Sequence, residues 1–282
     1  MSDGVPSPAS PAPPSTPGPS GSPAPPSPGR PRGPRRTVLA LATVAIPAAV
    51  AGPQLGLIAG GLGAAGIAVV IGLLIFSLGV HEAAHAQVAL WCGDPTARDL
   101  GRITIDPRPH IDPFQTIILP TILYLSAGFV FGGAKPVPVD IRRLRKPLRD
   151  MSLVALAGPG SNFLLAVLFA LVLGILLEFG FYTEDQAMVG ILTATVQLNL
   201  LLAAFNLMPV PPLDGSRVMT WLLPPGLRGP YVEMERYGML ILLGLVLFVP
   251  QFFLAVRWAM DTMMGGVLTI VSPILDLLHG VF

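Results

Sequence analysis

The sequence predicts an all-α polytopic membrane protein with about 5–6 transmembrane helices, a re-entrant or hairpin element and a disordered N-terminal tail. Hydrophobic residues occupy 52% of the 282 positions and charged residues only 12%, about half of the ~25% usual in soluble domains. Several apolar runs reach the roughly 20 residues that a helix needs to cross the hydrocarbon core. Basic residues gather between these runs, and the net charge is only +1. That distribution indicates orientation in a membrane and argues against a nucleic-acid partner.

The N-terminal 36 residues differ in composition from the rest of the chain. Residues 1–36 contain 13 of the 32 prolines, interleaved with Ser, Ala and Gly. Such a segment has little to bury, so we expect a disordered Pro-rich tail, either simply solvated or recognised by a partner domain. It ends in four arginines, which predict a cytoplasmic N-terminus by the positive-inside rule: Arg30, Arg32, Arg35 and Arg36. Residues 37–282 then form the transmembrane domain.

The first long apolar stretch accommodates two crossings. It runs from Thr37 to about Leu90 and is interrupted by prolines and by glycines near 60–63. We predict one crossing near 38–58 and a second near 62–91, which returns to the cytoplasmic side. Gly93-Asp94-Pro95 is a plausible stop for the second helix.

The next apolar stretch, 114–131, is expected not to cross. It contains Pro120 and Gly128, and both flanking segments, 93–113 and 135–149, carry several arginines. Basic residues on both sides predict that both flanks are cytoplasmic. The stretch is therefore interpreted as a re-entrant or hairpin element, which is tolerated at membrane depth when it packs against protein or lines a wet cavity.

The remaining apolar runs are expected to alternate across the membrane. Residues 151–178 cross outward, 187–208 return, and 237–256 cross again, while 258–282 either span or lie in the interface. The short connection at 179–186 contains no Lys or Arg, as expected for a loop outside the cytoplasm.

The sequence His81-Glu82-Ala83-Ala84-His85 lies near the cytoplasmic end of the second predicted crossing. On a helix, positions i and i+4 share one face, so both imidazoles can reach one cation. Neutral imidazole binds zinc well, and Glu82 is placed to act as the general base. A charged side chain at such depth costs about 2.5–3.5 kcal/mol on insertion scales, which favours a functional role over a packing role.

A catalytic zinc site requires a third protein ligand. The continuation found in soluble metzincins is absent, because Val88 and Trp91 occupy the required Gly and His positions. The chain has a single cysteine, which excludes Cys-based zinc clusters. Asp214 is the better candidate, because it follows the inbound 187–208 crossing and a proline-rich segment that we expect to be extended. From the residues alone, Pro-Pro-Leu-Asp-Gly is equally compatible with an ordinary turn.

The chain resembles the site-2 protease family of intramembrane metalloproteases. The resemblance rests on the His81–His85 motif paired with Asn206-Leu207-Met208-Pro209-Val210-Pro211-Pro212-Leu213-Asp214-Gly215. Further similar stretches are Gly93–Arg98, Gly101–Thr104, Ala134–Val139 and Ala157–Asn162. Together they cover roughly 65–220, and the candidate catalytic core is about 62–220. The resemblance implies that Asp214 is the third ligand of one Zn²⁺ per chain.

The resemblance also implies an activity: hydrolysis of peptide bonds in or near the transmembrane segments of membrane-protein substrates. Asn162 and Asn206 match family asparagines and are candidates for orienting substrate or stabilising the oxyanion, or else they form interhelical hydrogen bonds. His110 and Asp112 either support or gate the site, or are solvated loop residues, which is the interpretation we favour. Asp106 and Phe114-Gln115 depart from the family pattern and put the shape of the substrate entrance in question.

The expected setting is the cell (inner) membrane, with the N-terminus and the active site toward the cytoplasm. The expected partners are single-pass or other membrane proteins as substrates, together with the lipid bilayer; the sequence does not indicate the oligomeric state. Two other functions are alternatives for a membrane protein with such a motif. A catalytically silent scaffold predicts a damaged site, yet His81, Glu82, His85 and Asp214 are all present. A metal transporter predicts several polar residues along a path across the bilayer, which the 151–178 crossing lacks.

Overall fold

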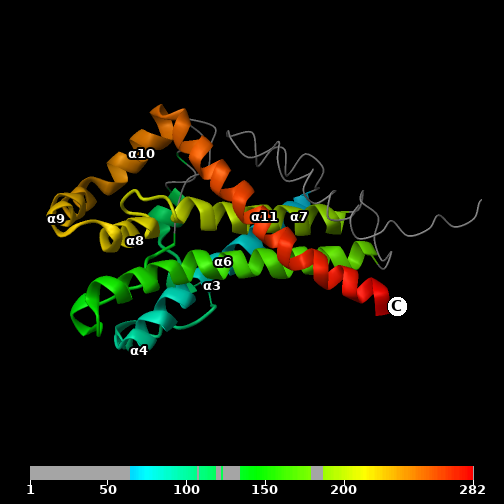
Figure 1. Cartoon of the computed structure of the whole chain (residues 1–282), viewed down its shortest axis with the longest axis horizontal. Coiled ribbons are helices and arrows are strands. Elements are labelled where there is room, and N and C mark those ends of the chain that lie inside the picture. Colours follow the sequence, from blue (N-terminus) through cyan, green and yellow to red (C-terminus); the bar gives the residue numbers. More distant parts are fainter. Residues whose placement is uncertain (1–63, 107, 119–121, 123–133, 179–186, 282) are drawn as a thin grey trace, which may run out of the picture. The chain divides into compact units, whose positions relative to one another are not determined.

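The computed structural model describes residues 64–106, 108–118, 122, 134–178 and 187–281. Regular structure within these ranges is helical throughout, as predicted (Figure 1). The predicted tail, the crossing near 38–58, the loop at 179–186 and most of the 114–131 element lie outside the described residues. The described start of that element forms a short π-helical turn, η2 (Pro113–Ile118).

Within the described residues, four helices are long and apolar enough to cross a membrane. They are α3 (Ala64–Cys92), α6 (Pro147–Glu178), α7 (Ala187–Asn206) and α11 (Pro250–Val281). Three of them match the predicted segments 62–91, 151–178 and 187–208 closely. The protein is therefore a multi-pass membrane protein.

The last part of the chain is divided differently from the prediction. The expected crossing at 237–256 is split between α10 (Gly238–Phe248) and the beginning of α11, with a break at Val249 (Figure 1). Pro250 explains the break, because the residue before a proline is disfavoured in the α region, and Val249 has φ −122° and ψ 87°. With 11 residues, α10 is about 16 Å long and too short to span the core. The described part of the 258–282 stretch, up to Val281, belongs to α11, which is long enough to span.

Short elements connect the long helices. They are α4 (Thr96–Asp99), η1 (Arg108–His110), η3 (Ile141–Arg143), α8 (Asp214–Leu222), α9 (Pro225–Glu233) and η4 (Met234–Tyr237). Helix α3 ends as predicted at Gly93, whose φ of +112° suits glycine and whose N–H donates to the carbonyl of Leu90.

Helix α6 is central to the packing, because it contacts α3, α7, α8 and α11. The main buried cluster contains small residues on α6 and α7, which allow the helix backbones to approach closely. Large apolar side chains on α3, α6 and α11 point outward instead, as expected for surfaces that face lipid: Val69, Phe76, Leu164, Leu168, Trp258 and Leu277. The polar residues described next lie where α3, α6 and α8 meet.

Candidate metal centre

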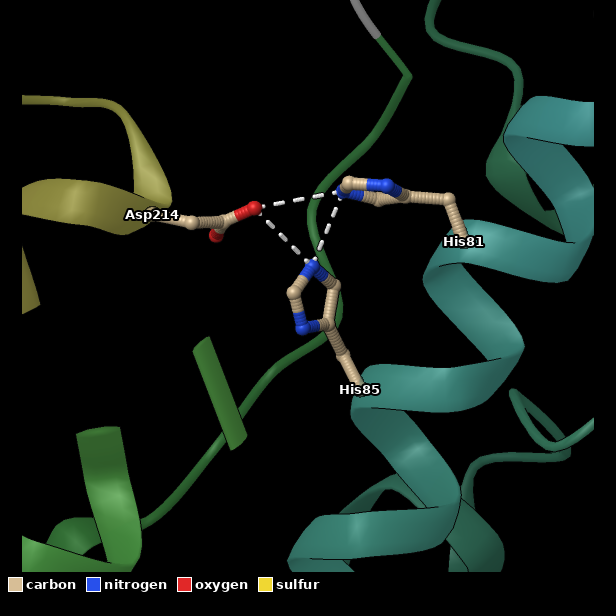
Figure 2. Close-up of side chains that lie close together, drawn as sticks. All are labelled: His81, His85 and Asp214. Carbon is tan, nitrogen blue, oxygen red and sulfur yellow. Dashed lines mark hydrogen bonds and ion pairs between the residues drawn. The ribbon is translucent and has the colours of Figure 1, made fainter. Parts of the chain in front are cut away.

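Three ligand-type side chains from distant parts of the sequence converge on one point. His81 and His85 project from the same face of α3, and Asp214 projects toward them from the start of α8 (Figure 2). The two Nε2 atoms are 3.0 Å apart, and Oδ2 of Asp214 lies 3.2 Å from Nε2 of His81 and 3.3 Å from Nε2 of His85. The structure thus brings together the three residues that the sequence predicted as ligands.

The donor set fits zinc. Ligands at about 2.0–2.1 Å from a tetrahedral zinc lie about 3.3 Å from one another, close to the three observed separations. Nδ1 of His85 lies 2.6 Å from the carbonyl oxygen of Val154. A carbonyl only accepts, so Nδ1 carries the hydrogen and Nε2 of His85 presents a lone pair. A cation among these atoms explains why lone pairs converge there.

Asp214 is ionised at neutral pH. Burial raises the pKa of its carboxyl, but the adjacent His81 and His85 side chains lower it by more, so the pKa lies well below its usual range. The carboxylate is therefore available as an anionic metal ligand, as the site requires.

Asp214 reaches the site because the chain turns sharply after α7. The 207–213 segment forms turns, with Val210 donating to the carbonyl of Met208 and Leu213 to that of Val210. Our expectation of an extended segment was therefore wrong, although prolines do prevent a regular helix there. Gly215 permits the close approach, since a Cβ at this position would collide with the carbonyl oxygens of Leu207 and Met208.

Gly158 leaves the space that the two histidines occupy. A Cβ built on this residue of α6 would lie 2.5 Å from Nε2 of His81 and closer still to Nε2 of His85. Any side chain here would enter the metal centre. In the sequence, Gly158 stands out only as part of a family-like stretch, and the available signal was a pair of glycines flanking Pro159 inside an apolar helix.

Glu82 is held by a segment far along the chain. Its Oε2 accepts a hydrogen bond of 3.1 Å from the backbone N–H of Val137. That segment is anchored by Asp94, which is fully buried and whose carboxylate accepts the N–H groups of Thr96 and Asp140 at 3.0 and 2.7 Å. Burial raises the pKa of Asp94, and these hydrogen bonds outweigh that effect, so its pKa is lowered. In the sequence, Asp94 was interpreted only as part of the helix stop Gly93-Asp94-Pro95.

The two predicted asparagines have protein partners. Asn162 is fully buried, and its Oδ1 lies 2.7 Å from Nδ1 of His81. The amide nitrogen of Asn206 donates to the carbonyl of Leu202 at 3.0 Å. A role for either residue in binding substrate or an oxyanion stays a prediction.

The two loop residues that were expected to be solvated, His110 and Asp112, differ in burial. His110 is buried, with Nε2 3.1 Å from the carbonyl oxygen of Thr104, so our expectation of a solvated side chain was wrong for it. Its backbone carbonyl accepts the N–H of Lys135 and so connects the loop to the Val137 segment. Asp112 is half-buried and accepts the N–H of Phe114.

Long apolar helices thus surround a His–His–Asp cluster that can hold a metal ion. The sequence pattern of Peptidase family M50 matches residues 66–184. Together with the relatives described next, this match shows that the chain belongs to family M50, the site-2 protease family.

Two similar proteins support this assignment. The "Putative zinc metalloprotease YwhC" of Bacillus subtilis is 42% identical over 190 residues, which cover 66% of this chain and 83% of that relative. The "Putative zinc metalloprotease Rip2" of Mycolicibacterium smegmatis is 30% identical over 204 residues, 69% of this chain and 73% of that relative. No solved protein structure shows a significant match.

Proposed function

We propose that this protein is an intramembrane protease that hydrolyses peptide bonds in or near the transmembrane segments of other membrane proteins. The observation that carries the proposal is the position of the centre. His81 and His85 lie on a helix able to span the membrane, about 10–17 Å along it from the end at Cys92. A peptide bond cleaved at such a centre belongs to a chain that enters the membrane.

The residues of the centre divide into metal ligands and a general base. His81, His85 and Asp214 hold the zinc ion, which supplies Lewis-acid activation of a water molecule and of the substrate carbonyl. Glu82 accepts the proton of the attacking water at a carboxylate oxygen and delivers it to the leaving amine nitrogen. The N–H of Val137 holds Oε2 of Glu82, and we assign the proton transfer to the other oxygen.

The substrate has to expose its scissile carbonyl before it can react. Carbonyl groups within a transmembrane helix are hydrogen-bonded to their own helix, so the substrate must unwind locally. We further propose, from the basic loops of the sequence, that the centre opens toward the cytoplasmic side of the cell membrane. Single-pass and other membrane proteins are the expected substrates.

The test compares wild type with Glu82→Gln on a panel of single-pass membrane proteins in proteoliposomes. Loss of a general base lowers the rate by about 10²–10⁴-fold, while the zinc ligands stay intact, so Glu82→Gln should retain its zinc and lose cleavage. Wild-type rates in Glu82→Gln would refute the role of Glu82. A wild-type protein that holds zinc and cleaves only soluble peptides would refute the intramembrane substrate class.

A further inference from the structure

Buried polar groups continue from the metal centre into α7. The amide nitrogen of Asn162 donates to Oδ1 of Asn199 at 3.2 Å, and the amide nitrogen of Asn199 donates to the backbone carbonyl of Thr195 at 2.9 Å. Asn162 is 0% exposed, and Asn199 and Thr195 are each 1% exposed. These groups therefore depend on one another and not on bulk water.

The backbone carbonyl of Thr195 in α7 fixes which group donates and which accepts in each of these hydrogen bonds. A backbone carbonyl only accepts, so the nitrogen of Asn199 must face Thr195 and its oxygen must face Asn162. Asn162 must therefore donate from its amide nitrogen to Oδ1 of Asn199. Its oxygen then faces Nδ1 of His81, which has to be the protonated ring nitrogen. The lone pair of His81 is thereby placed at Nε2, beside Asp214.

We propose that Asn199 is a positioning residue of the metal centre, which holds His81 in its zinc-binding tautomer through Asn162. Without Asn199, the Asn162 amide can turn over and present its nitrogen to Nδ1 of His81. Nδ1 would then accept, and the hydrogen would sit on Nε2, where it blocks metal binding. His85 needs no such support, because its Nδ1 faces the backbone carbonyl of Val154, which can only accept a hydrogen bond.

The test measures zinc affinity and not peptide cleavage, so it can fail or succeed separately from the proposed function. In the full-length protein in detergent, Asn199→Leu removes the amide while keeping the same number and branching of side-chain heavy atoms. We expect the zinc Kd, measured by competition with a chromophoric chelator, to rise about tenfold, the lower end of the range for groups that support metal ligands. Ser152→Ala is the matched control: it removes one hydrogen bond within α6 from a residue 1% exposed and should leave Kd within about twofold.

A double-mutant cycle separates positioning from packing. In Asn162→Asp, both carboxylate oxygens accept, so His81 keeps its tautomer whichever way the group turns. Adding Asn199→Leu to that background should change the zinc Kd by less than about twofold, because the coupling between the two sites is gone. Asn199→Ala serves in the same cycle if Asn199→Leu does not fold. A tenfold loss on adding Asn199→Leu that persists in the Asn162→Asp background, or wild-type affinity in the Asn199→Leu single variant, would overturn the proposal.

Discussion

Replacing Gly158 with alanine tests the geometry of the metal centre at the level of one methyl group. The added Cβ would lie 2.5 Å from Nε2 of His81, whereas ordinary contacts begin near 3.4 Å, so the imidazole has to move by about 0.9 Å. Zinc sites tolerate errors of only about 0.2 Å in ligand distance. The rings also have little freedom, because both Nδ1 atoms are within hydrogen-bonding distance of α6, at Asn162 and Val154.

We therefore expect Gly158→Ala to weaken zinc binding at least about 100-fold, which corresponds to about 2.7 kcal/mol. The assay is zinc content by mass spectrometry of purified protein together with chelator competition. Gly160→Ala is the control, because a Cβ at Gly160 meets no atom within 4 Å and lies two residues further along the same helix. Full zinc occupancy and wild-type affinity in Gly158→Ala would refute the packing of α6 against the two imidazoles.

Two other predictions concern the third ligand and the anchor of the Val137 segment. Asp214→Ala should purify with reduced zinc, since two imidazoles alone hold the ion weakly; full occupancy would place the third ligand elsewhere. Asp94→Asn should destabilise the protein by about 1–3 kcal/mol, because an amide nitrogen would face either the N–H of Asp140 or the Thr96 groups. The midpoint of thermal unfolding measures this, with Asp99→Asn on the exposed face of α4 as the control. The pKa of Asp94 is lowered in the folded protein, so its stabilisation is complete above the ordinary pKa and disappears as the pH falls through the lowered value. Wild type and Asp94→Asn should accordingly converge in strongly acidic solution; a constant difference down to that pH would contradict the argument.

Much of the metal centre could be predicted from the sequence because the features that indicate it, the spacing of the histidines and the apolar runs, involve residues close together in the chain. His81 and His85 are four residues apart, and the helical repeat alone places them on one face. The long apolar runs likewise predict α3, α6 and α7 within a few residues, because length and hydropathy decide whether a helix can span. Gly93 ends α3 for an equally local reason, its positive φ.

Two expectations failed, one for a local reason and one because it depends on contacts between distant segments. Val249 was placed inside a helix because its apolar neighbours dominated the pattern, whereas the proline after it ends α10. His110 is polar and lies in a loop, and only tertiary contacts show that it is buried.

The sequence by itself determined the membrane class, the pair of histidines with Glu82 between them, and Asp214 as one of two interpretations. Only the tertiary structure decided that Asp214 reaches both imidazoles, that Gly158 leaves room for them, and that Asn199 supports His81 through Asn162. The physical reason is the range of the interactions. Helical periodicity and hydropathy act between near neighbours, whereas ligand convergence and hydrogen-bond direction depend on how α3, α6, α7 and α8 pack.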